Sequence, residues 1–133
     1  MEIMIISSLV EKEGKTDHDK RLISSVIMNR LDKNIKLQID ATTIFSITGG
    51  QYKFNRKLNY NDLKYKNKYN TYFIRGLPPS PICFVSRKTI ELVMENYKSD
   101  YLFYFYNEKI QKHIFSKTFK KHKELLNIYR NNE

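Results

Sequence analysis

Two glutamates near the start of the chain, Glu11 and Glu13, are the residues best suited to acid–base chemistry. They close an apolar stretch that predicts a helix from Glu2 to Glu13, with Gly14 as its stop. Side chains two positions apart on a helix point about 200° away from each other. The two carboxylates therefore cannot act as a facing pair, and at most one of them faces inward.

Glu13 is the better candidate for a catalytic acid because it shares a helix face with Ile6, Leu9 and Val10. An apolar wall disfavours the charged form of a carboxyl group, and so does the partial negative charge at a helix C-terminus. Both effects raise the pKa, which keeps a glutamic acid protonated near neutral pH as a general acid. The alternative is a solvated Glu-Lys-Glu turn at a frayed helix end, and the local pattern alone favours that alternative.

Two further groups of polar residues carry the side chains that a sugar site uses, namely amides, hydroxyls and aromatic rings. Capping and loop hydrogen bonds use the same residue types, and without further support this structural role is favoured. Among the histidines, His113 falls in a β-prone segment and could line a cleft, whereas His18 and His122 are expected to be solvated. The two groups are Asn29-Arg30 with Gln38 and Asp40, and the tract Tyr69–Tyr72.

The composition describes a basic chain of 133 residues with a single cysteine, Cys83. Because 24 Lys and Arg oppose 14 Asp and Glu, an anionic partner such as an acidic glycan, nucleic acid or membrane surface is favoured. The alternative is a solvated basic surface without a dedicated role. One cysteine excludes an internal disulfide and a cysteine-based metal site, and we expect neither a metal nor a cofactor. No stretch approaches the roughly 20 apolar residues of a membrane span.

The elements that position these residues are predicted to form an α+β fold, with helices around a small, mostly antiparallel sheet. Residues 1–133 are expected to form one domain, in which residues 51–68 are a polar loop with one helical turn after Asn61. Strands are expected at Thr71–Ile74 and in a hairpin of Tyr101–Tyr106 with His113–Phe115. Helices are expected over Glu2–Glu13, from a cap at Thr16 or Asp17 to Leu31, over Thr42–Thr48, from Ser86 to Tyr97 with Met94 inward, and from a cap at Ser116 to Tyr129.

Several sequence blocks, in the same order and at similar spacing, make the chain resemble the MltG/YceG-like family of endolytic murein transglycosylases, in its catalytic part. The resemblance covers roughly Ile3 to Tyr129. The matching blocks are Val10-Glu11-Lys12-Glu13, Asn29-Arg30-Leu31, Leu37-Gln38-Ile39-Asp40-Ala41-Thr42, Tyr69 to Ile82 with its Gly-Leu-Pro-Pro core, Asp100 to Phe105, and His113-x-Phe115 followed by His122.

The resemblance implies a YceG-like catalytic domain that cuts peptidoglycan glycan strands inside the strand. Family members cleave the β-1,4 bond between N-acetylmuramic acid and N-acetylglucosamine and leave a 1,6-anhydro-muramic acid end. It also implies that the second glutamate of the box, Glu13, is catalytic, with Glu11 as the reserve choice. Substrate-binding roles are implied for Gln38, Asp40, Asn70, Tyr72 and His113. The implied setting is the cell envelope, on the periplasmic side of the inner membrane, with cell-wall synthases as possible partners.

The chain departs from the family pattern in ways that leave other functions open. Met1 stands about ten residues before the glutamate box, so the family's N-terminal membrane helix and LysM-like region are expected to be absent. Ala41 stands for a usual proline, Ser80 for a glycine and Asp19 for a glutamate. One alternative is a non-catalytic peptidoglycan-binding remnant of the family. Another is a small basic nucleic-acid-binding protein, although the chain lacks an RNP-type or helix-turn-helix signature.

Overall fold

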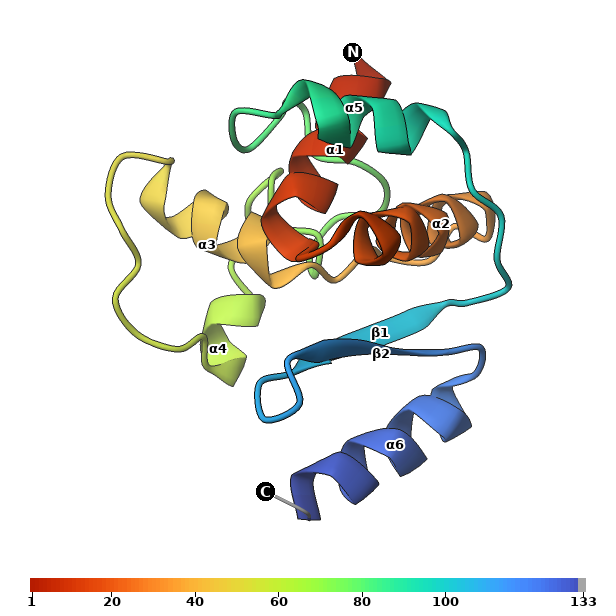
Figure 1. Cartoon of the computed structure of the whole chain (residues 1–133). Helices are drawn as coiled ribbons and strands as arrows, with labels where there is room; N and C mark the ends of the chain where they lie inside the picture. Colours follow the sequence, from red (N-terminus) through yellow and green to blue (C-terminus); the bar gives the residue numbers. More distant parts are fainter. Residues whose placement is uncertain (132–133) are drawn as a thin grey trace.

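The computed structural model describes residues 1–131, which form six helices and one two-stranded antiparallel sheet, an α+β arrangement as predicted (Figure 1). In the β-hairpin, Phe103 lies opposite Ser116 and Asn107 lies opposite Lys112. Helices α1, α2 and α5 pack on one another, and the hairpin lies between α2 and α6. The elements are α1 (Glu2–Glu13), α2 (Asp17–Asp32), α3 (Asp40–Thr48), α4 (Tyr60–Leu63), α5 (Arg87–Met94), β1 (Phe103–Asn107), β2 (Lys112–Ser116) and α6 (Phe119–Asn131).

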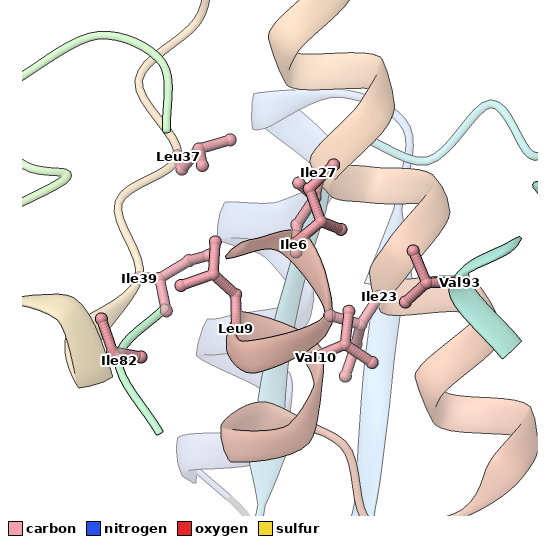
Figure 2. Close-up of a cluster of buried hydrophobic side chains, with 9 residues drawn as sticks. All are labelled: Ile6, Leu9, Val10, Ile23, Ile27, Leu37, Ile39, Ile82 and Val93. Atoms are coloured by element: carbon pink, nitrogen blue, oxygen red, sulfur yellow. The ribbon is translucent and has the colours of Figure 1, made fainter. Parts of the chain in front are cut away.

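The hydrophobic core forms around one face of α1, as its helical spacing predicts. Figure 2 shows Ile6, Leu9 and Val10 of α1 among aliphatic side chains from α2, α5 and the loops. Leu9 and Val10 are fully buried, and each such side chain contributes about 1.5–3 kcal/mol relative to an exposed one. Since Glu13 follows one turn later on the same face, the packing that secures α1 also carries the Glu13 carboxyl inward.

A tight connection between α1 and α2 fixes the end of the first helix. Gly14 caps α1 by donating its backbone N–H to the Val10 carbonyl oxygen at 2.9 Å. A Cβ atom at Gly14 would collide with the Lys20 side chain, so the two helices approach closely because this residue is glycine. Thr16 then caps α2, since its hydroxyl accepts the Asp19 N–H at 3.1 Å. Both signals agree with the predicted start and stop.

Three sequence predictions are wrong: one strand, the start of α6 and the end of α5. Residues 71–74 form turns rather than a strand. Their backbone N–H groups donate to nearby residues and to a threonine hydroxyl, not to a neighbouring strand. The last helix is capped by Thr118, whose hydroxyl accepts the Lys121 N–H at 3.1 Å, whereas Ser116 ends β2. Helix α5 stops at Met94 rather than Tyr97 because Asn96 takes a left-handed conformation with φ 53°. Met94 is therefore 65% exposed instead of inward.

Buried threonines and an asparagine join the start of α3 to the turns at residues 70–74. The Thr71 hydroxyl accepts the Ile39 N–H at 2.8 Å and lies 2.7 Å from the Thr42 hydroxyl. The fully buried Asn70 amide accepts from the Thr43 hydroxyl and the Tyr72 N–H, and it donates to the carbonyls of Leu63 and Tyr65. These bonds replace the strand pairing that was expected here.

Replacing Asn70 with alanine tests this network. Asn70→Ala removes four hydrogen bonds and leaves buried partners unpaired, so we expect the free energy of unfolding to fall by about 3 kcal/mol. Denaturant unfolding followed by circular dichroism measures the loss. The exposed Asn61 serves as the control, and equal stability of the Asn70→Ala and Asn61→Ala variants would contradict this account.

Candidate active site

A cavity of about 460 Å³ runs along the free edge of β1. Three consecutive residues, Tyr104, Phe105 and Tyr106, line it, although successive side chains of a strand point to opposite faces. One cavity can touch all three only at the strand's edge, and β2 occupies the other edge. The remaining lining residues are Glu13, Arg30, Leu37, Gln38, Asp40, Tyr72, His113, His122, Leu126 and Arg130.

The Glu13 carboxyl has an unusually high affinity for its proton. Burial, together with the nearby negative charge of Asp40, raises the pKa of Glu13 from its usual 4.5 to about 7. The charge of Lys15 and a hydrogen bond with the Tyr104 hydroxyl act in the opposite direction. A glutamic acid with this pKa is divided between its protonated and ionised forms near pH 7, so it can both give and take a proton.

Asp40 is held beside Glu13 by Tyr72. Asp40 is the first residue of α3, and its Oδ1 accepts a hydrogen bond of 2.7 Å from the Tyr72 hydroxyl. Burial and this hydrogen bond raise the pKa of Tyr72, so the hydroxyl remains a donor. The buried bonds of Asn70 and Thr71 fix the backbone that carries Tyr72.

Gln38 reaches the cavity through an uncommon backbone conformation. Its φ is 53°, in the left-handed region that few non-glycine residues adopt. The Gln38 N–H donates to the Thr71 carbonyl oxygen at 3.2 Å, and the neighbouring Leu37 and Ile39 side chains are buried in the core. Gln38 therefore points away from the core between two buried side chains, and it lines the cavity.

His113 enters the cavity from β2 and is oriented by Asp19 of α2. Its Nδ1 lies 2.8 Å from Asp19 Oδ2, and its side chain is only 2% exposed. The ring also packs against Tyr104 and Tyr106, with centroid separations of 5.8 and 4.9 Å. A carboxylate on one ring nitrogen sets the orientation of the other, so Asp19 controls how His113 faces the cavity.

Comparison with known proteins shows to which family this chain belongs. A sequence profile of the YceG-like family matches residues 1–127. The chain belongs to the YceG-like family. The resemblance expected from the sequence blocks is thereby confirmed.

Two relatives and one solved structure set the extent of the similarity. The endolytic murein transglycosylase of Bacillus subtilis (strain 168) is 34% identical over 127 residues, which are 96% of this chain and 34% of that protein. The endolytic murein transglycosylase of Streptococcus pneumoniae (serotype 2, strain D39) is 32% identical over 108 residues, 77% of this chain and 19% of that protein. A crystal structure of a YceG-like protein from Listeria monocytogenes superposes with a TM-score of 0.85 at 37% identity, covering 93% of this chain and 39% of that one. This YceG-like chain thus spans about a third of the length of the Bacillus relative.

Two of the predicted site residues lie outside the cavity lining. Glu11 stabilises the start of α5: its Oε1 accepts the Ser86 N–H at 2.8 Å, and its Oε2 lies 3.3 Å from Lys20 Nζ. The Ser86 bonds and the Lys20 charge lower the pKa of Glu11 to about 2, so it stays ionised near neutral pH. Asn70 is fully buried in the network below Tyr72. Glu13, Gln38, Asp40, Tyr72 and His113 are brought together.

Sequence reasoning missed Tyr104 and placed His122 wrongly in solvent. His122 lines the cavity and stacks on Phe103 with centroids 5.1 Å apart. For both Tyr104 and His122, the sequence contains a pattern that could have predicted this position. The two-residue period of strands puts Tyr104 on the same face as Tyr106, which pairs with His113. Helical spacing puts His122 on one face with Leu126, which also lines the cavity.

Two further observations concern metals and membranes. Within residues 1–131, no group of three or more His, Cys, Asp or Glu side chains is arranged to hold a metal ion. In the same part of the chain, no helix combines the length and the apolar character that crossing a bilayer requires.

The two glutamates should affect stability in opposite ways. Glu13 ionises near pH 4.5 when unfolded but near 7 when folded, so its charge destabilises the fold as pH rises through 7. We expect Glu13→Gln to be about 3 kcal/mol more stable than the wild type at pH 8 and equal to it at pH 4. Urea unfolding at the two pH values measures the difference.

Glu11 provides the matched control because its pKa shifts the other way. Its ionised form stabilises the fold above pH 4.5, and this contribution is lost as pH falls through 2. With a discount for its partial exposure, Glu11→Gln should cost about 1 kcal/mol at pH 7. A destabilised Glu13→Gln variant at pH 8 would refute the buried state of that carboxyl.

Proposed function

We propose that this YceG-like chain is the catalytic part of an endolytic peptidoglycan lytic transglycosylase, a non-hydrolytic enzyme. The relatives of Bacillus subtilis and Streptococcus pneumoniae are named endolytic murein transglycosylases. Because the chain spans only part of these relatives, the observation that carries the proposal is local: the pKa of Glu13 is raised to about 7 in the largely polar cavity at the β1 edge.

The proposed reaction needs one carboxyl group that changes role. Protonated Glu13 gives its proton to the glycosidic oxygen of the bond between N-acetylmuramic acid and N-acetylglucosamine, and that bond breaks. The Glu13 carboxylate then takes the proton of the muramyl 6-hydroxyl as this oxygen attacks the anomeric carbon. The products are a free 4-hydroxyl and a 1,6-anhydro-muramic acid end, and Glu13 is protonated again. Ordinary glycosidases use two carboxyl groups for hydrolysis.

The neighbours of Glu13 suit this step. The Tyr104 hydroxyl favours the ionised form of the Glu13 carboxyl through hydrogen bonding. Asp40, fixed by Tyr72, supplies negative charge close to where the anomeric carbon becomes positive. Gln38 and His113 supply hydrogen-bonding groups for hydroxyl and acetamido substituents. Proton transfer by a placed acid contributes roughly 10²- to 10⁴-fold, so electrostatics and positioning supply the remainder.

The substrate sets the proposed place of action. Peptidoglycan strands lie outside the cytoplasmic membrane, so we assign the activity to the cell envelope, on the periplasmic side of the inner membrane. Cell-wall synthases, which produce these strands, are the expected protein partners. The basic surface suits an anionic polymer of this kind, and nucleic acid is not the partner that this cavity favours.

Product analysis tests the catalytic role of Glu13. Wild-type protein incubated with uncrosslinked glycan strands should release fragments that end in 1,6-anhydro-muramic acid, detected by mass spectrometry. Glu13→Gln removes the only proton donor in the scheme, so we expect at least about a 10³-fold loss of rate. Glu11→Gln, whose side chain lies outside the cavity, should retain most of the activity.

Two outcomes would reject parts of this proposal. Full activity of Glu13→Gln would reject the site assignment. Strand binding by the wild type without any anhydro product would instead identify a peptidoglycan-binding protein without catalysis.

A further inference from the structure

The cavity has a positively charged end that the proton transfer does not use. We call it the basic end; its charge comes from Arg30 of α2 and Arg130 of α6, and His122 of α6 lies beside them. Within residues 1–131, neither arginine forms an ion pair with a carboxylate. Arg30 is buried, where most charges in proteins are paired, whereas Arg130 is exposed. This end of the cavity therefore holds positive charge that no carboxylate of the described residues compensates.

Arg30 is held rigidly with one edge free. Its Nε donates to the Leu102 carbonyl oxygen at 2.7 Å, and its Nη1 donates to the Lys36 and Leu37 carbonyl oxygens at 2.7 and 3.3 Å. The guanidinium also lies 5.0 Å from the Phe103 ring centroid. Its Nη2 has no hydrogen-bond partner in the described chain and is not a buried atom. A fixed guanidinium with a free N–H edge is preorganised for an anion.

His122 lies beside this guanidinium and has an unsatisfied nitrogen. Its ring stacks on Phe103 and meets Phe105 edge-on. Its Nδ1 is buried and, within residues 1–131, has no hydrogen-bond partner. Burial, together with the charges of Arg30 and Arg130, lowers the pKa of His122, which keeps the ring neutral. A buried polar atom without a partner costs stability and calls for a functional explanation.

We propose that the basic end binds a carboxylate carried by the muramyl residue of the glycan strand or by its stem peptide. This inference rests on the proposed function and names a group of the substrate that the same cavity recognises. Two sources offer the same chemistry: the lactyl carboxylate of an unsubstituted muramic acid, and the free carboxylates of a stem peptide. Because Glu13 and Arg30 line one cavity, the bound carboxylate fixes which sugar presents its linkage to Glu13.

Binding to the Glu13→Gln variant, in which we expect no cleavage, tests the inference. The probes are peptide-free strands with free lactyl carboxylates, the same strands with these groups converted to methylamides, and strands with stem peptides. We expect at least one carboxylate-bearing probe to bind about tenfold more tightly than the methylamide strands, with a preference that shrinks at high salt. Adding Arg130→Gln should reduce this preference about fivefold. Adding Arg87→Gln, which removes the same charge from an exposed position on α5, should not.

A second variant separates recognition from folding. His122→Phe keeps a ring on Phe103 and removes the unsatisfied nitrogen, so the melting temperature should rise while the carboxylate preference falls. A higher melting temperature with an unchanged preference would assign His122 to packing alone and remove it from the proposed site.

The pattern of affinities identifies the source or rejects the site. Tighter binding of the free lactyl strands identifies the lactyl group, and tighter binding of the peptide strands alone identifies the stem peptide. Equal affinity for all three probes, or equal effects of Arg130→Gln and Arg87→Gln, overturns the inference. Cleavage by the wild type is measured separately, so its absence rejects the proposed function without affecting the binding result.

Discussion

The burial of the Glu13 carboxyl at the end of α1 is the constraint on which the site depends. Ile6, Leu9 and Val10 secure α1 in the core, and helical geometry then points Glu13 inward one turn later. Gly14 allows α2, which begins at Asp17, to approach α1 closely, because a Cβ atom at this position would collide with Lys20. The packing of the core therefore holds in place a carboxyl group whose ionisation destabilises the fold.

The hairpin and Glu13 together line a cavity that has two different walls. Tyr104, Tyr106 and His113 share one face of the sheet and lie toward Glu13. Phe103 and Phe105 occupy the opposite face, where α6 packs against them. One cavity meets both faces, because its lining includes Glu13 and Asp40 as well as Arg30 and His122. Figure 1 shows the hairpin lying between α2 and α6.

Local signals made most elements and part of the site predictable. The roles of Gly14 and Thr16 follow from simple capping rules. The aromatic run Tyr101–Tyr106 predicted the hairpin, with ends within two residues of those in the structure. Thr71 was less readable, because a β-branched residue suits a strand and here serves as a buried hydroxyl for the start of α3. The sequence distinguished Glu13 from Glu11 because the two lie on different faces of the helix. The structural role of Glu11 is seen only in the structure, where its carboxylate accepts the Ser86 N–H.

A residue that serves as acid and then as base needs a pKa near the working pH, and opposing forces set that value here. Desolvation and Asp40 hold the proton on Glu13, while Lys15 and Tyr104 favour its release. Lys15 is itself placed by contact with the Tyr106 ring, 5.3 Å from its centroid. Stronger desolvation alone would give an acid too weak to donate, and a closer cation would give a base too weak to accept. The aromatic strand β1 therefore carries Tyr104, which bonds the carboxyl, and Tyr106, which positions the cation that limits its pKa.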